Sequence, residues 1–296
     1  DVYKRQAMCT PIPEFPAWDP AAPYGETFMA TLKDPPCDDP VWSPDTDEEL
    51  LRRTVEVMES QNVIGVLSGT TERVATWMEA APGRFIPGLQ FNAAATEVSP
   101  DSLRSLVETG AVEVLAEVTN QYSGMAPDDP RMEPYWALAE ELDIPVGIHI
   151  GPGPPGTPYL GFGGYRASLH SALTLEPVLA RHPRLRVYIM HAGFPMIDDL
   201  LALLYAHPQV YVGVGVIVFT RPDFDGYLQR IVEAGHANRV MFGSDQMVWP
   251  EVIERSIDRI QSLTYLTAAQ KRDILYNNAA RFLRLSEEQM ARHHGM

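Results

Sequence analysis

The sequence predicts an α/β fold, a TIM-like (β/α)8 barrel that lacks its first strand. Short apolar runs rich in β-branched residues recur along the chain, and longer amphipathic segments separate them, which is typical of parallel strands joined by helices. The repeat is close to the roughly 31 residues that one unit takes in a barrel of about 250 residues. No Gly-x-Gly-x-x-Gly loop follows an early run. That absence disfavours the alternative, an open doubly wound sheet around a nucleotide.

Seven apolar runs are the expected strands, one fewer than a closed barrel of this type requires. They lie at residues 63–67, 85–91, 112–118, 146–150, 187–191, 210–214 and 240–243. A helix over residues 45–60 is expected before them, because Ser43-Pro44-Asp45 and the acids that follow are typical of a helix start. No strand precedes that helix in the pattern, so the missing strand would lie upstream of it.

Three parts are expected along the chain. Residues 1–44 are rich in proline and aromatic residues without a helical or strand period, which indicates an irregular segment. Residues 45–285 form the barrel, and residues 286–296 form a polar tail. The first six residues read Asp-Val-Tyr-Lys-Arg-Gln, which resembles the translation of a sequencing-library adapter. We therefore expect a chain truncated at its N-terminus, with natural sequence from near Ala7 onward.

Composition excludes several classes of protein. The chain has 296 residues, 45% of them hydrophobic and 21% charged, which are values of a folded globular protein. Its net charge of -16 disfavours binding to nucleic acid or to an anionic membrane surface. No apolar stretch approaches the roughly 18 residues of a membrane-spanning helix. The expected partner is a small-molecule substrate, and homo-oligomers stay open.

The chain contains two cysteines, Cys9 and Cys37. Two are too few for a disulfide-rich scaffold or for a zinc site built from cysteines. They would pair in an exported protein and stay as free thiols in the cytoplasm. The compartment therefore stays open between cytoplasmic and, if a leader was lost upstream, periplasmic or secreted.

Polar residues stand at the carboxyl ends of four expected strands: Glu117, His149, His191 and Asp245. In an α/β barrel these ends share one face, where the loops after the strands build the active site. Two imidazoles and a carboxylate suit one divalent metal, most simply zinc, with manganese as the other choice. Asp245 could instead act as a base toward a metal-bound water. A single histidine at a strand end can merely bond a loop carbonyl, but matched placement on three strands favours a site.

The motifs at these strand ends resemble those of a known family. Val146-Gly147-Ile148-His149, Met190-His191-Ala192-Gly193 and Met241-Phe242-Gly243-Ser244-Asp245 are similar to the strand 5, 6 and 8 motifs of the amidohydrolase superfamily. The match is closer to its amidohydrolase-related branch of metal-dependent hydrolases and decarboxylases. Residues 277–282 also resemble the terminal helix of that branch. The resemblance covers residues 45–285, and the Phe-Gly-Ser-Asp motif is its most specific part.

The resemblance implies a distorted (β/α)8 barrel that binds a divalent metal through a His-x-His pair on strand 1, His149, Asp245 and in some members His191. Asp245 would take the proton of the attacking water, and His191 would stabilise developing negative charge. Glu117 is a further candidate ligand, because some members of the superfamily place a ligand on strand 4. The alternative is a charge at the rim of the strand that pairs with a loop group. This sequence departs from the pattern, because no His-x-His precedes His149. The missing pair and the missing strand would have the same cause.

The expected activity is divalent-metal-dependent hydrolysis of a carbonyl or ester-like carbon, as in an amide or a lactone. One alternative is non-oxidative decarboxylation of an aromatic or enoic acid on the same site, and another is a non-catalytic barrel that binds a small molecule. Arg166 is a candidate to pair with a substrate carboxylate, and Trp249 is a candidate to line the pocket. A solvent-exposed arginine and a packing tryptophan are the competing interpretations. The chain as written is expected to bind metal weakly and to show little activity.

Overall fold

Parallel strands form the centre of the molecule. The computed structural model describes residues 6–15 and 17–295, so most of the adapter-like start lies outside the described residues. The central strands are β3 (Gly65–Leu67), β4 (Phe85–Pro87), β5 (Leu115–Val118), β6 (Val146–His149), β7 (Val187–Met190), β8 (Val210–Gly213) and β9 (Val240–Met241). Each of the seven expected runs contains one of these strands, in the expected order.

Each central strand lies beside its predecessor in the chain. β5, β6, β7, β8 and β9 form one parallel sheet, and β3 pairs in parallel with β4. Single bridges from Gly88 to Val114 and from Phe91 to Val118 continue the row from β4 to β5. Within the described residues, no strand pairs with the outer edge of β3 or of β9. The order is that of an α/β barrel with an opening between its first and last described strands.

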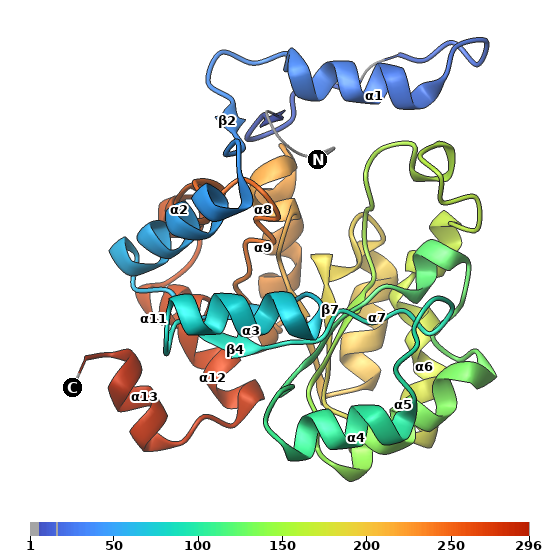
Figure 1. Ribbon diagram of the computed structural model, residues 1–296, viewed down its shortest axis with the longest axis vertical. Helices are drawn as coiled ribbons and strands as arrows, with labels where there is room; N and C mark the ends of the chain where they lie inside the picture. The colour runs from blue at the N-terminus through green and yellow to red at the C-terminus, as the bar shows by residue number, and fades with distance from the viewer. Residues whose placement is uncertain (1–5, 16, 296) are drawn as a thin grey trace.

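Helices cover the outside of the strands (Figure 1). They are α2 (Asp47–Ser60), α3 (Thr71–Ala80), α4 (Pro100–Glu108), α5 (Glu133–Glu141), α6 (Glu176–Arg181), α7 (Ile197–Ala206), α8 (Ile217–Thr220), α9 (Phe224–Glu233), α10 (Val252–Ser262), α11 (Ala268–Arg272) and α12 (Asn278–Leu283). The first of these starts two residues later than expected, because Thr46 caps it by accepting a hydrogen bond from the backbone N–H of Glu49.

Two helices distant in sequence, α2 and α10, pack against each other. Met58 of α2, Ile253 of α10 and Phe85 of β4 belong to one buried cluster. Arg53 of α2 forms an ion pair with Glu251, the residue before α10. The first and last parts of the barrel are therefore joined by helices, although β3 and β9 do not pair.

The N-terminal segment corrects the expectation of an irregular region. Helix α1 (Tyr24–Lys33) spans its middle, and β1 (Ala7–Met8) pairs antiparallel with β2 (Val41–Trp42). The sequence pattern did not predict this helix because prolines flank it on both sides. Residues 24–34 themselves contain no proline, so a helix can form there. In Figure 1 this segment, in blue, lies at one end of the molecule above the strands. Cys9 and Cys37 are joined by a disulfide.

The polar tail also contains regular structure, α13 (Glu287–His293). Ser286 and Gln289 form a capping box at its start, in which each side chain bonds the backbone N–H of the other. No helix in the described part of the chain is both long and apolar enough to cross a membrane.

Candidate metal centre

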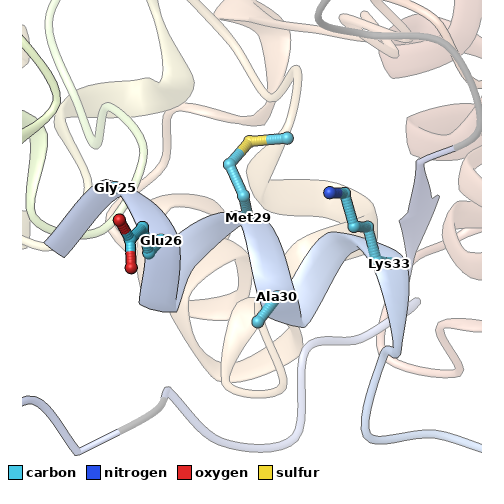
Figure 2. A pocket seen from close by; sticks show the side chains of 5 residues that line it. All are labelled: Gly25, Glu26, Met29, Ala30 and Lys33. Carbon is cyan, nitrogen blue, oxygen red and sulfur yellow. The ribbon is translucent and has the colours of Figure 1, made fainter. Parts of the chain in front are cut away.

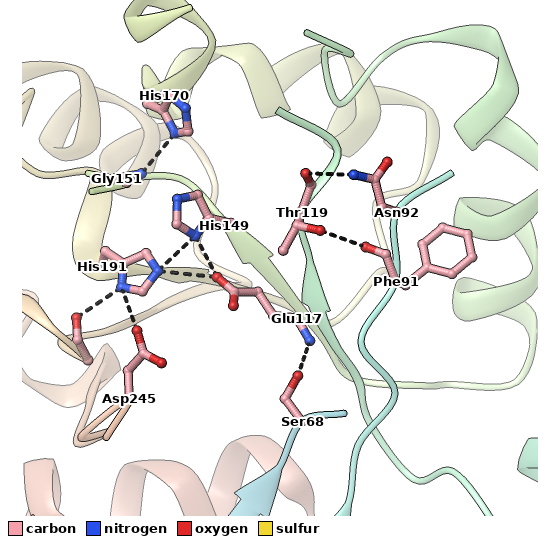
Figure 3. Close-up of polar contacts among 12 residues, drawn as sticks. Ser68, Phe91, Asn92, Glu117, Thr119, His149, Gly151, His170, His191 and Asp245 are labelled. Carbon is pink, nitrogen blue, oxygen red and sulfur yellow. Dashed lines mark hydrogen bonds and ion pairs between the residues drawn. The ribbon is translucent and has the colours of Figure 1, made fainter. Parts of the chain in front are cut away.

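Glu117, His149 and His191 meet at the carboxyl ends of β5, β6 and β7 (Figure 3). Nδ1 of His149 donates a hydrogen bond to Oε1 of Glu117 at 2.5 Å. Nε2 of His191 lies 3.2 Å from the same oxygen and 2.9 Å from Nδ1 of His149. Both imidazoles are buried, and the Glu117 side chain is 18% exposed. These three side chains therefore lie close together, and their roles as metal ligands stay predictions.

The three donor atoms fit one divalent cation. Tetrahedral ligands about 2.1 Å from zinc lie about 3.4 Å from one another, so small outward shifts would open this cluster to accept the ion. His191 is already oriented for such a role, because its Nδ1 donates to the carbonyl oxygen of Gly215 at 2.9 Å. This bond leaves Nε2 as the atom that would face a metal.

Asp245 lies beside the metal group. Its Oδ2 is 3.9 Å from Nδ1 of His191, on the edge of the imidazole that also meets Gly215. Asp245 follows β9 in the chain, and Figure 3 shows its side chain beside His191. Its ligand role stays a prediction, whereas its position next to His191 suits a residue that transfers protons.

A glycine at position 151 allows the strand ends to approach so closely. A Cβ atom there would lie 2.4 Å from Cβ of His191. The backbone N–H of Gly151 donates to Nδ1 of His170 at 3.3 Å, and the ring of His170 lies 5.4 Å from that of His149. Residues on the loop after β6 therefore fix the geometry between the two ligand histidines.

Burial and mutual charge set the protonation of the metal group. Burial raises the pKa of Glu117, but the imidazoles of His149 and His191 outweigh it and hold that pKa well below its ordinary value. Burial lowers the pKa of His149, which stays neutral despite Glu117. For His191, burial also lowers the pKa, yet Glu117, Asp245 and the Gly215 carbonyl together raise it to about 9. Without a metal, the group therefore carries one proton more than two neutral imidazoles would, and a cation must displace that extra proton from His191.

Asp245 is poised differently from Glu117. Burial raises the pKa of Asp245 to about 6, against the opposing effect of the charged His191. A carboxylate with a pKa in this range can both accept and return a proton near neutral pH.

Aromatic side chains border the metal group on the side of His149. The ring of Tyr122 lies 4.7 Å from the imidazole of His149, and Phe162 and Tyr165 lie 5.1 and 5.7 Å from Tyr122. No motif in the sequence singles out these residues. Tyr122 could have been found, because it lies four residues after β5 at the same edge as the ligands.

Arg166 and Trp249 do not contact the metal group. The exposed Arg166 donates to the backbone carbonyls of Gly163 and Tyr165, at 2.8 and 2.7 Å, and so braces its own loop. Trp249 is buried in the core and donates from Nε1 to the carbonyl of Gln6 at 3.1 Å. Their roles in binding a substrate stay predictions.

A shallow hollow of about 480 Å³ lies elsewhere, against helix α1 (Figure 2). It is lined by Gly25, Glu26, Met29, Ala30 and Lys33. None of the polar residues at the strand ends lines this hollow. We therefore do not assign the functional site to it, and we place that site at the strand ends.

A parallel α/β barrel with a carboxylate and two imidazoles at its strand ends is an arrangement typical of metal-dependent enzymes. The family model for amidohydrolases matches residues 11–285, and the chain belongs to this family. A comparison with curated proteins gives no match. The family uses a divalent metal, and Glu117, His149 and His191 are residues that could hold one here.

Solved structures share the fold at low sequence identity. The 2,6-dihydroxybenzoate decarboxylase from Rhizobium is 16% identical, with a TM-score of 0.61 over 96% of this chain and 97% of that one. A probable 2-pyrone-4,6-dicarboxylic acid hydrolase from Acinetobacter baumannii is 17% identical, with a TM-score of 0.59 over 79% and 89%. The 5-carboxyvanillate decarboxylase from Novosphingobium aromaticivorans, complexed with manganese, is 17% identical, with a TM-score of 0.54 over 73% and 68%. At these identities the likeness establishes a TIM-barrel fold.

Proposed function

We propose that this protein is a divalent-metal-dependent hydrolase that acts on a carbonyl or ester-like carbon of a small molecule, such as an amide or a lactone. The observation that carries the proposal is the convergence of Glu117, His149 and His191 beside Asp245. A bound divalent cation polarises a substrate oxygen and makes water a better nucleophile at neutral pH.

The residues of the chain supply the proton transfers. Asp245, with a pKa of about 6, accepts a proton from the attacking water and returns it to the leaving group. The carbonyl oxygen of Gly215 accepts a hydrogen bond from Nδ1–H of His191 and so keeps the proton on that nitrogen. This places a donor beside Asp245, at the position where negative charge develops during the reaction. Two imidazoles and one carboxylate favour zinc as the cation, with manganese as the alternative.

The test is a panel of lactones, amides and esters offered to protein loaded with zinc or manganese. Turnover of a lactone or amide without release of carbon dioxide supports the proposal. Asp245→Asn should remove that turnover while metal stays bound. Failure of the whole panel in a metal-loaded protein would overturn hydrolysis.

A second candidate function is non-oxidative decarboxylation of an aromatic acid on the same site. The aromatic side chains of Tyr122, Phe162 and Tyr165 favour it, because they offer faces against which a flat ring can pack. Release of carbon dioxide from a panel of aromatic and enoic acids would select this reaction. Binding of such acids without turnover on either panel would instead indicate a non-catalytic binding barrel.

A further inference from the structure

The loop after β6 borders the metal group. Its residues Phe162 and Tyr165 pack on Tyr122, which packs on His149. Further along the same loop, His170 accepts the hydrogen bond from Gly151. Movement of the middle of this loop, which spans residues 150–171, would therefore change the aromatic border of the site.

The N-terminal segment clasps this loop from outside. The hydroxyl of Tyr24 donates to the carbonyl of Pro155 at 2.7 Å. The ring of Trp18 lies 4.8 Å from that of Tyr159 and 5.2 Å from that of Tyr24. Gly156 makes the fit possible, because a Cβ atom at this position would lie 2.1 Å from the Tyr24 ring.

A disulfide closes the clasping segment into a ring. Cys9 and Cys37 lie 28 residues apart, and both Trp18 and Tyr24 fall between them. The base of the ring is fixed to the barrel by Arg255 of α10, which bonds Oγ1 of Thr10 at 2.6 Å and Oδ2 of Asp39 at 2.8 Å. The ring is thus tied to the barrel at its base and to the loop at its tip.

We propose that Trp18 and Tyr24 are positioning residues that hold the loop after β6 against the site, and that the Cys9–Cys37 disulfide maintains this clasp. Reduction by a dithiol supplies two electrons and two protons, so the disulfide becomes two thiols and the dithiol becomes a disulfide. The freed segment then gains conformational entropy, and the loop loses its outer support.

The inference rests on the proposed function only in treating the strand ends as the active site. Its test is hydrogen–deuterium exchange of the loop amides, which needs neither turnover nor metal. Calorimetry measures the binding of Mn²⁺ to the same samples and so reports separately on the metal group. A loop that is released while Mn²⁺ still binds can therefore be told apart from a loop that is held while Mn²⁺ no longer binds.

Substitutions on both sides of the contact between Tyr24 and Gly156 test the clasp. Tyr24→Ala removes the ring and the hydrogen bond, and Gly156→Ala displaces the ring by collision. Each should speed exchange over residues 153–166 by about tenfold or more, because local opening becomes easier. Tyr24→Phe keeps the ring in place and should restore most of the protection. The double variant Tyr24→Ala/Gly156→Ala should exceed neither single variant by much, because both remove one contact.

Matched controls come from the same loop and from a distant tyrosine. Gly156 and Gly161 both have a positive φ, of 70° and 99°, so alanine is strained at either position, but a Cβ atom at position 161 meets nothing within 4 Å. Gly161→Ala therefore measures the effect of backbone strain alone, and it should speed exchange near Tyr24 much less than Gly156→Ala does. Tyr265→Phe removes a comparable bond from a tyrosine to the carbonyl of Asp225, and it should not affect the loop. Equal acceleration in these controls would overturn the role of the clasp.

Reduction tests the disulfide. Dithiothreitol should speed exchange over residues 17–35 and 153–166 together. In the Cys9→Ser/Cys37→Ser variant, exchange over both ranges should already be fast without reductant, and dithiothreitol should not change it further. Mn²⁺ affinity should stay within about twofold, because the ligand group lies on the barrel strands. Loop exchange that is equally slow in oxidised and reduced protein, or in wild type and Tyr24→Ala, would refute the proposal.

Discussion

Asp245 and Glu117 lie at opposite nitrogens of one imidazole, that of His191. Oδ2 of Asp245 is 3.9 Å from Nδ1, and Oε1 of Glu117 is 3.2 Å from Nε2. The ring therefore separates a carboxylate held ionised from a carboxylate whose pKa lies near 6. This arrangement gives the two carboxylates different expected roles, one in binding a cation and one in moving protons.

Removal of a ligand should be separable from removal of the proton acceptor. His149→Ala should weaken zinc binding by at least tenfold, because it deletes one of three donor atoms. Asp245→Asn should keep zinc within a few fold but lower turnover about 10²- to 10⁴-fold. Metal content by mass spectrometry and rates on the identified substrate check both. His207→Ala, a change at the end of α7, serves as the control. Near-normal rates in the two site variants would show that the assignment is wrong.

Metal binding should strengthen as pH rises from 7 to 9. The pKa of His191 is raised to about 9, so a cation must displace its proton throughout this range. The apparent association constant should rise roughly tenfold per pH unit and level off above about 9. Calorimetry in buffers of different ionisation enthalpy would count the proton released. An affinity independent of pH would mean that His191 is neutral before metal binds.

The same proton links pH to the stability of the metal-free protein. The folded pKa of His191 lies above its ordinary value of 6.5, so this stabilisation is complete below pH 6.5 and is lost as pH rises through about 9. The melting temperature of metal-free protein should fall across this window. His191→Gln should flatten the fall, and an unchanged slope in that variant would assign the effect to other groups.

Gly151→Ala should disturb the metal group without touching a ligand. The added Cβ atom would collide with Cβ of His191, so the imidazole or the strand end must move. We expect zinc affinity to drop about tenfold or more, because ligand placement is exacting. Gly163→Ala is the control, since nothing lies within 4 Å of its added carbon. Equal affinity in both variants would show that the strand ends adapt.

Local pattern predicted the strands and the positions of the candidate ligands because each signal is contained in one short run. His149 and His191, for example, come directly at the end of apolar segments, where barrel geometry places them on one face. Helix α1 was missed because its flanking prolines dominate the pattern around it. The contact of Tyr24 with Pro155 was not predictable, because it joins separate segments of the chain. The contact of Gly151 with His170 joins the two ends of one long loop and depends equally on tertiary packing.

The Arg53–Glu251 ion pair joins residues 198 positions apart, whereas every central strand lies beside its neighbour in the chain. Closing a loop of that length costs more entropy than pairing successive strands. We therefore expect the strands to assemble progressively along the chain, with α2 meeting α10 as a late event. Folding intermediates should consequently show protected amides in β6 and β7 before α2 becomes protected, so the order of folding follows the order of synthesis only until the barrel has to close.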